Sequence, residues 1–239
     1  MIVLIEAEQG KITSDMSFAG YMGAKSDSDA EIKTTSINGL SIALIGLNKE
    51  DVLPVGSVDF IKKVCEIMEV ELPEPLNIPA LLIPDLGRKV WTQRKSELES
   101  FPCFVKPLEE VKLFTGFVVQ SKSDLDNNFE MKDWNGMLFC SELIGNIISE
   151  WRCYILNGKV LNCSCYRGDP LFFPDREKIL ELMSKFENSP AGYSLDVAVT
   201  VKGSELIECN DAWALGYYGG EFSDYYKMVK ARWLEIINN

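Results

Sequence analysis

The sequence predicts an α+β fold with a small α/β region at its N-terminus. The dipeptide Asn157-Gly158 separates two apolar runs, 151–156 and 159–166, and it is the strongest two-residue signal for a β-hairpin. Elsewhere in the 239 residues, strand patterns and amphipathic helices follow one another irregularly. A regular alternation of strand and helix would instead predict a parallel sheet throughout.

Residues 1–82 are expected to form the α/β region. Apolar stretches predict strands over 2–7 and 41–47. A helix is expected after Ser57, a good N-cap, because apolar side chains then recur at helical spacing, at Val58, Ile61, Val64, Cys65 and Met68. Three prolines in the segment 72–79 cannot stand inside a helix, so we expect a stiff connector there.

Residues 83–239 are expected to form a second domain, with a small lobe over 83–140 and a large lobe over 141–239. Its predicted elements are a short helix over 93–99, strands over 104–106, 116–120 and 137–143, a helical turn capped by Ser123, the hairpin, a helix over 175–186, strands over 195–201 and 205–209 around Lys202-Gly203, and a helix over 224–237.

The hairpin turn also fixes a predicted register. Directly opposed residues share a face of the sheet, and a strict two-residue turn pairs Tyr154 with Leu161, Arg152 with Cys163, and Glu150 with Cys165. If the ladder continues, Arg167 lies on the same face. Two arginines and a glutamate on a half-apolar face are unusual for a plain core, which makes this face a candidate functional surface.

Composition excludes several classes of function. The net charge of −12 would repel most phosphate backbones, so no nucleic-acid partner is expected. Histidine is absent, which removes Ser-His-Asp and Cys-His catalysis and the usual zinc sites. No stretch of 18 apolar residues predicts a membrane span, and the N-terminus lacks the basic region of a signal peptide. Seven cysteines without a dense framework predict reduced thiols, so we expect a cytoplasmic protein.

The candidate metal ligands lie on the last two predicted strands. Glu208 and Asn210 are two residues apart, so they point to one face, and a carboxylate beside an amide oxygen suits Mg²⁺. Asp196 lies on the preceding strand. It pairs with Asn210, and all three converge, only if the Lys202-Gly203 turn carries one extra residue. The alternative is that all three are solvated positions at a sheet edge.

Three weaker features precede them in the chain. Lys106 ends an apolar strand and is fixed by a following proline, so its charge could meet a phosphate, although exposed lysines are common. The loop Lys112–Gly116 could bring its backbone near phosphates, but it lacks the spacing of a Walker loop. The segment 142–144 could offer backbone groups to an adenine ring and Glu150 could accept from ribose hydroxyls; both could equally be solvated acids at a strand end.

Taken in order, these residues resemble the ATP-grasp superfamily over roughly residues 86–220. The resemblance extends to Gly87-Arg88-Lys89-Val90, to Ser149-Glu150-Trp151-Arg152 and to Gly216-Tyr217-Tyr218-Gly219. It implies two α+β lobes that grip ATP. It further implies these roles: phosphates held by Lys106, with Lys112 nearby; adenine framed by Glu142, Leu143 and Ile144; ribose bound by Glu150; and one or two Mg²⁺ bound by Asp196, Glu208 and Asn210.

The resemblance also implies an activity: a Mg-ATP-dependent ligase that joins small-molecule or peptide carboxylates to amines through an acylphosphate. Many members carry an arginine where this chain has Ser194, so Arg152 or Arg167 is expected to act with Lys106 in its place. The residues 216–220 are a candidate substrate or closure loop, or a plain turn. A non-catalytic ATP-binding regulator, a kinase on the same scaffold and an acidic interaction protein remain alternatives, and the oligomeric state is open.

Overall fold

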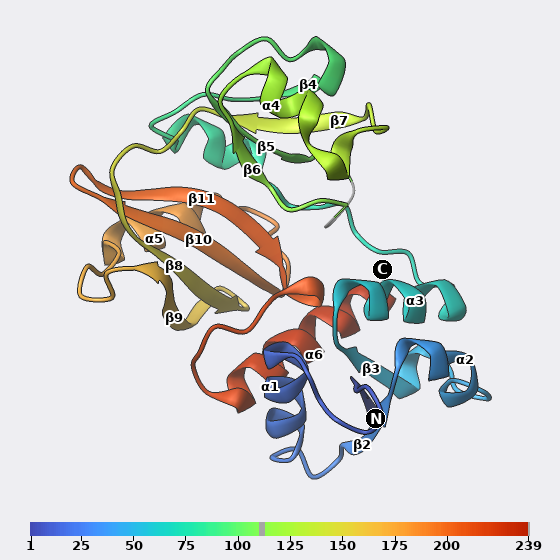
Figure 1. The fold of residues 1–239 in the computed structure, drawn as a ribbon. Coiled ribbons are helices and arrows are strands. Elements are labelled where there is room, and N and C mark those ends of the chain that lie inside the picture. Colours follow the sequence, from blue (N-terminus) through green and yellow to red (C-terminus); the bar gives the residue numbers. More distant parts are fainter. Residues whose placement is uncertain (110–112, 239) are drawn as a thin grey trace.

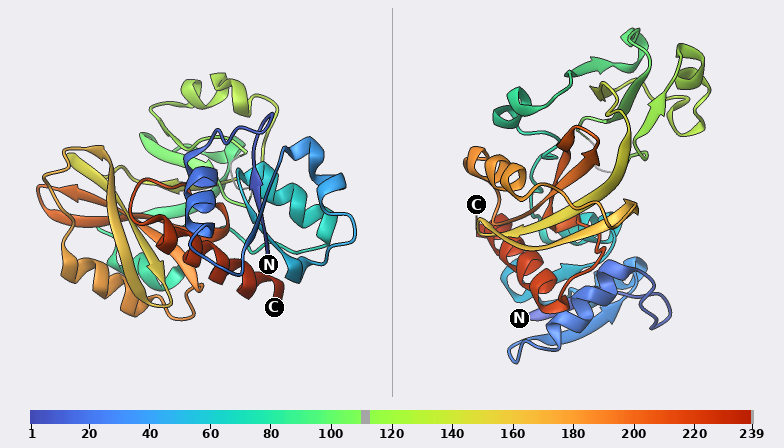
Figure 2. Two further views of the ribbon diagram at one scale, coloured as in Figure 1. Left: turned by 90° about the horizontal axis from the view of Figure 1, so that it is seen from below. Right: turned by 90° about the vertical axis from the view of Figure 1, so that its left-hand side faces the viewer.

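Three separate β-sheets follow one another along the chain in the computed structural model, which describes residues 1–109 and 113–238 (Figure 1). The first sheet has three strands and the other two have four each. Each sheet has its own apolar core, and two further views show the three parts side by side (Figure 2). Among the described residues, no helix is long and apolar enough to cross a membrane.

The N-terminal sheet is parallel, with the strand order β2-β1-β3. Its elements are β1 (Ile2–Glu6), α1 (Asp15–Ala24), β2 (Glu31–Thr35), α2 (Leu40–Ala43), β3 (Val52–Val55) and α3 (Val58–Met68). The α/β expectation is therefore confirmed for this region, but the strand expected over 41–47 is wrong. Leu40 and Leu44 are buried four residues apart whereas Ile42 and Ile45 are exposed, so this segment follows the helical period.

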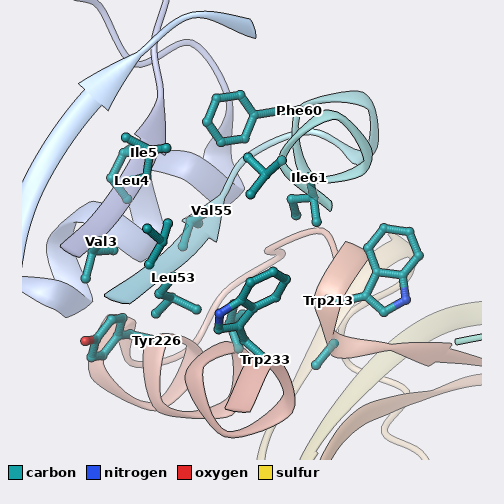
Figure 3. Close-up of a cluster of buried hydrophobic side chains, with 14 of the residues drawn as sticks. Val3, Leu4, Ile5, Leu53, Val55, Phe60, Ile61, Trp213, Tyr226 and Trp233 are labelled. Atoms are coloured by element: carbon teal, nitrogen blue, oxygen red, sulfur yellow. The ribbon is translucent and has the colours of Figure 1, made fainter. Parts of the chain in front are cut away.

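The C-terminal helix α6 (Phe222–Asn238) returns to this first sheet. Trp233 and Tyr226 on α6 are buried with Leu53 and Val55 of β3 (Figure 3). Arg232 is also buried there, and its guanidinium donates to both oxygens of Asp211 at 2.7–3.1 Å. Because α6 directly follows the last sheet in the chain, it ties that sheet to the N-terminal core.

The second sheet is antiparallel, with the order β4-β7-β5-β6. Its elements are β4 (Val90–Arg94), β5 (Cys103–Pro107), β6 (Phe117–Val119), α4 (Lys122–Asn127) and β7 (Met137–Ser141). The helix expected over 93–99 is wrong, because these residues end β4 and then form only a 3-10 turn, Lys95–Glu97. The helical cap is Ser121, which accepts from the Asp124 amide, and not Ser123.

The third sheet has the order β11-β10-β8-β9 and is antiparallel throughout. Its elements are β8 (Ile147–Leu156), β9 (Lys159–Gly168), α5 (Arg176–Lys185), β10 (Gly192–Thr200) and β11 (Gly203–Asp211). One face is covered by α5 and by the 3-10 helix Ala80–Asp85, which pack on Cys153, Leu195 and Val197 (Figure 1). Polar side chains project from the opposite face.

The predicted hairpin forms, but its register is not the predicted one. Leu156 opposes Lys159 as expected. Two bulges in β9 then shift the pairs, so that Tyr154 opposes Asn162, Arg152 opposes Ser164 and Glu150 opposes Arg167. The expected companions Cys163 and Cys165 therefore lie on the other face, whereas Arg167 does share the face of Glu150.

The cysteines also depart from expectation. Cys153 and Cys163 oppose each other across β8 and β9 and form a disulfide, so the prediction of seven free thiols is wrong for this pair. The free cysteines are Cys65, Cys103, Cys140, Cys165 and Cys209, and all except Cys165 are buried. Burial raises the pKa of Cys65 and Cys140 to about 12, so these two thiols stay protonated and act as core side chains.

The predicted cap of α3 gives a direct test of the N-terminal region. The Ser57 hydroxyl accepts from the Phe60 amide at 3.2 Å and donates to Glu6 at 2.9 Å. Ser57→Ala is therefore expected to lower the free energy of unfolding by about 1 kcal/mol, measured by urea denaturation. Ser123→Ala, at the serine that is not a cap, is the matched control and is expected to change it by less than about 0.5 kcal/mol. Equal effects would contradict this cap assignment.

Candidate functional site

The candidate site lies on the polar face of the third sheet, where β10 is flanked by β8 and β11. Asp196 on β10 opposes Arg152 on one side and Glu208 on the other. Ser194, two residues earlier on β10, opposes Asn210 and Tyr154. Because opposed residues share a face, all of these side chains project together.

This convergence comes from a bulge in the strand, not from the turn. The two-residue turn is Val201-Lys202, one residue earlier than expected, since Thr200 pairs with Gly203. One extra residue then lies within β11, between Leu206 and Glu208. The predicted pairing of Asp196 with Asn210 is therefore wrong, although Asp196, Glu208 and Asn210 do share one face.

Arg152 holds Asp196 by two hydrogen bonds. Its Nε donates to Oδ1 at 2.8 Å and its Nη2 donates to Oδ2 at 2.6 Å. The two side chains are only 9% and 3% exposed. Such a paired, two-point contact is the geometry in which a guanidinium best compensates a buried carboxylate.

Lys106 connects the second sheet to this face. It comes from β5, and its Nζ donates to Glu208 Oε2 at 2.6 Å, with side-chain exposures of 17% and 25%. The other oxygen of Glu208 accepts from Asn210 Nδ2 at 3.1 Å. Lys106 also lies over the ring of Phe139, 5.4 Å from its centroid, so an aromatic face helps to orient the cation.

The two carboxylates have opposite pKa shifts. Burial raises the pKa of Asp196, and the charge of Glu208 adds to this, so the net shift is upward although Arg152 opposes it. Burial also raises the pKa of Glu208, but the charge and hydrogen bond of Lys106 outweigh that effect and the net shift is downward. Glu208 is therefore held as an anion, and Asp196 depends on Arg152 to stay ionised.

An aromatic wall covers Arg152 on the side of the loop 216–220. The guanidinium carbon lies 4.6 Å from the ring centroid of Tyr218 and 6.0 Å from that of Tyr166, and the two rings are 5.1 Å apart. The Tyr154 hydroxyl donates to Gly216 O at 3.0 Å and accepts from the Tyr218 amide at 2.7 Å. The loop is thus hydrogen-bonded to the face that carries the site.

In chemical terms, the site combines two cations, two carboxylates and an amide at the junction of two sheets. Cations of this kind bind phosphate oxygens, and carboxylate and amide oxygens bind hard divalent metal ions. Each cation is paired with a carboxylate, which is an arrangement that a metal ion and a polyphosphate could enter together. Residues 86–228 match a family described as an ATP-grasp domain, the second family of its clade.

The chain belongs to the ATP-grasp family.

Solved structures with this fold agree with the assignment. D-alanine–D-alanine ligase from Bacillus anthracis gives a TM-score of 0.59 at 15% identity, covering 99% of this chain and 98% of that one. A RimK domain ATP-grasp protein from Sphaerobacter thermophilus gives 0.55 at 12% identity, covering 100% of both chains. N5-carboxyaminoimidazole synthetase from Staphylococcus aureus gives 0.53 at 11% identity, covering 97% and 77%. At these identities the likeness shows the fold alone. No curated protein matches the chain.

The other residues predicted for this ATP-grasp site lie near the junction or outside it. Glu142 follows β7, and one of its side-chain oxygens accepts from the Lys89 amide at 2.7 Å. Leu143 and Ile144 continue into the connection to β8, where Leu143 is 39% exposed. Glu150 accepts from Arg167 at 3.0 Å, but Arg167 is 77% exposed. Lys112 lies outside the described residues.

Two kinds of site residue were missed by the sequence argument. Tyr166 and Tyr218 contact Arg152 only because β9 bulges and the loop folds back, and neither event has a short sequence signal. Arg88 was noted only as part of a familiar segment, yet it reaches β11 across the junction. An arginine between a stiff connector and a predicted strand, in a chain this acidic, was the available clue.

Proposed function

We propose that this protein is an ATP- and Mg²⁺-dependent ligase that joins a carboxylate to an amine. One observation carries the proposal. Lys106 of the small-lobe sheet meets Glu208 on the same face where Arg152 meets Asp196, so the two lobes build one charged cluster. In an ATP-grasp domain, such a cluster between two lobes has the chemistry needed to hold a nucleotide triphosphate with its metal ion.

The residues present fit a magnesium ion. Asp196, Glu208 and Asn210 offer two carboxylates and an amide, which is a hard donor set. No group of three or more acidic or sulfur side chains gathers as a metal cluster in the part of the chain that the structure describes. Mg²⁺ commonly binds one or two protein carboxylates and completes its shell with water and phosphate oxygens, where it offsets their negative charge.

Lys106 and Arg152 would then hold the phosphates. In the structure both cations neutralise the carboxylates. With those carboxylates on a cation, both side chains are free to bind phosphate oxygens and to offset charge as it develops. Arg152 fits this role better than Arg167, because it is buried beside Asp196 whereas Arg167 lies in solvent beside Glu150. We therefore assign to Arg152 the task that an arginine at position 194 performs elsewhere in the family.

The proposed reaction has two steps. A carboxylate oxygen of the first substrate attacks the γ-phosphorus of ATP, the bond to the β-phosphate oxygen breaks, and ADP leaves an acylphosphate. The amine of the second substrate then attacks the acyl carbon, loses a proton and expels inorganic phosphate. Neither step needs a protein nucleophile or a histidine; both need alignment and charge neutralisation, which this residue set supplies.

The adenosine end would lie where the small lobe joins the large one. Residues 142–144 connect β7 to β8, and Glu150 lies on β8 beside the cluster, with its side chain 12% exposed. The structurally similar ligase from Bacillus anthracis has been solved as a complex with ATP, with a TM-score of 0.57 at 14% identity. The backbone of 142–144 would border the adenine, and Glu150 would accept from the ribose.

Release of ADP with pooled amino-acid acceptors is the decisive test of this proposal. We expect ADP and inorganic phosphate in equal amounts, only when a carboxylate and an amine are both present. Hydroxylamine should replace the amine and trap the acylphosphate as a hydroxamate. Glu208→Gln should release ADP more slowly and regain part of the rate at high Mg²⁺, because one anionic ligand has become neutral.

The other outcomes separate the alternatives. ADP without inorganic phosphate, with a stable phosphorylated product, would indicate a kinase and would contradict the ligase. ATP binding without turnover, whatever acceptor is supplied, would favour a regulatory protein. No binding of ATP at any Mg²⁺ concentration would remove every reading that places a nucleotide at this site.

A further inference from the structure

The bulge in β11 decides which way the candidate metal ligands point. Val197 opposes Leu206 and Asp196 opposes Glu208, so Ile207 has no partner on β10. If the register had continued without the extra residue, Ile207 would oppose Asp196. Glu208 would then oppose Leu195 and turn into the apolar core on the other face. The bulge therefore places Glu208 and Asn210 on the face of Asp196.

Arg88 binds the backbone at this bulge. Its Nη1 donates to Leu206 O at 2.7 Å and its Nη2 donates to Ile207 O at 3.0 Å. Successive carbonyls of a regular strand point to opposite edges, so two consecutive ones can reach a single guanidinium only where the strand is irregular. The planar fork of arginine matches such a pair, whereas a lysine offers a single point of contact.

The same side chain is anchored in the small lobe. Arg88 precedes β4, and its Nε donates to Ser141 Oγ at the end of β7 at 2.8 Å. Its guanidinium thus donates to one hydroxyl and to two backbone carbonyls of the described chain. The connector supports the same strand from one more position, since Asn77 O accepts from the Cys209 amide at 2.7 Å. The outer edge of β11 is thus held on both sides of Glu208.

We propose that Arg88 is a positioning residue that fixes the bulge at Ile207, so that Glu208 and Asn210 face Asp196. The meaning of that face as a metal site rests on the proposed function. The clamp itself is a property of the chain without metal or nucleotide, and it can be tested in that state.

Deletion of Ile207 gives the sharpest test. It leaves Val197 opposite Leu206 and Asp196 opposite Glu208 in a regular ladder, so the site keeps its facing and Arg88 has no bulge to hold. We expect Arg88→Met in the full-length chain to speed hydrogen exchange at the amides of 206–210, and to weaken Mn²⁺-dependent ATP binding about tenfold. In the deletion background, the same substitution should change both quantities by less than about twofold.

Two further variants separate the fork from the charge. Arg88→Lys should behave like Arg88→Met, because one ammonium group cannot bond both carbonyls. Arg94→Met is the matched control: it removes a guanidinium that donates to Asn135 O at 2.9 Å within the small lobe, and it should leave exchange at 206–210 unchanged.

Equal losses in the two backgrounds, or full retention by Arg88→Lys, would overturn the proposal and indicate direct contact with ATP. If the deletion variant shows no cooperative thermal transition, exchange in the full-length chain decides: unchanged protection of 206–210 in Arg88→Met overturns the clamp. If the natural chain binds no ATP, the proposed function fails, while the exchange comparison still tests the clamp by itself.

Discussion

Replacing Arg152 by methionine is expected to lower the free energy of unfolding by about 3–5 kcal/mol, the range for breaking a buried ion pair from one side. Both oxygens of Asp196 accept from this one guanidinium, and the Asp196 side chain is 3% exposed. The substitution therefore leaves a buried carboxylate without its cation. Urea or thermal denaturation of the metal-free protein measures the loss directly.

The pH dependence gives this prediction its sign. Asp196 already has a raised pKa in the folded protein, chiefly because it is buried, and removal of Arg152 takes away the groups that oppose the rise. A group whose pKa is higher in the folded state stabilises below its unfolded pKa, and this stability is lost as pH rises through the folded value. The difference between the variant and the natural protein should therefore shrink as pH falls toward about 4.

Two variants control for the loss of any arginine and for lost packing. Arg167→Met removes the exposed partner of Glu150 and should cost no more than about 1 kcal/mol. Arg152→Met combined with Asp196→Asn removes both charges and should be more stable than Arg152→Met alone. A double variant no more stable than the single one would show that packing of the Arg152 stem, and not the charge of Asp196, sets the effect.

Much of the fold was predictable because its local signals agree with the final packing. The Asn157-Gly158 turn, the Ser57 cap and the apolar period of α3 each depend on neighbours within a few residues, and each formed as predicted. The strand expected over 41–47 failed because its apolar residues fit two periods. Burial of Leu40 and Leu44 against the N-terminal core chose the helical one.

The site was predictable in its members more than in its geometry. Strand period alone placed Glu208 and Asn210 on one face, and both lie there with Asp196. The reason is a bulge at Ile207, which the sequence does not mark: β-branched residues are ordinary in strands, and the supporting guanidinium comes from more than a hundred positions earlier. Contacts of such long sequence separation, like those of Tyr218 with Arg152, exist only once the sheets have met.

The inter-lobe position of Lys106 makes it the residue whose loss should reduce turnover most without a comparable loss of stability. Lys106→Met is expected to lower kcat/KM for ATP by about 10²–10³, the usual effect of removing one preorganised cation or donor from a developing charge. Glu208 loses its cation but remains 25% exposed, so the free energy of unfolding should fall by no more than about 1 kcal/mol. Lys106→Arg keeps the charge and should recover part of the rate.

Lys122 offers the matched control for this prediction, since it lies in the same lobe on α4, is 44% exposed and pairs only loosely with Asp126 at 3.5 Å. Lys122→Met should leave kcat/KM for ATP unchanged. An unchanged kcat/KM in Lys106→Met would remove Lys106 from the phosphate site, and an equal fall in Lys122→Met would point to a general effect of charge. A fall confined to Lys106, with binding of Mg²⁺ retained, would mean that the small lobe contributes its cation to the phosphates while Asp196, Glu208 and Asn210 hold the metal ion from the large lobe.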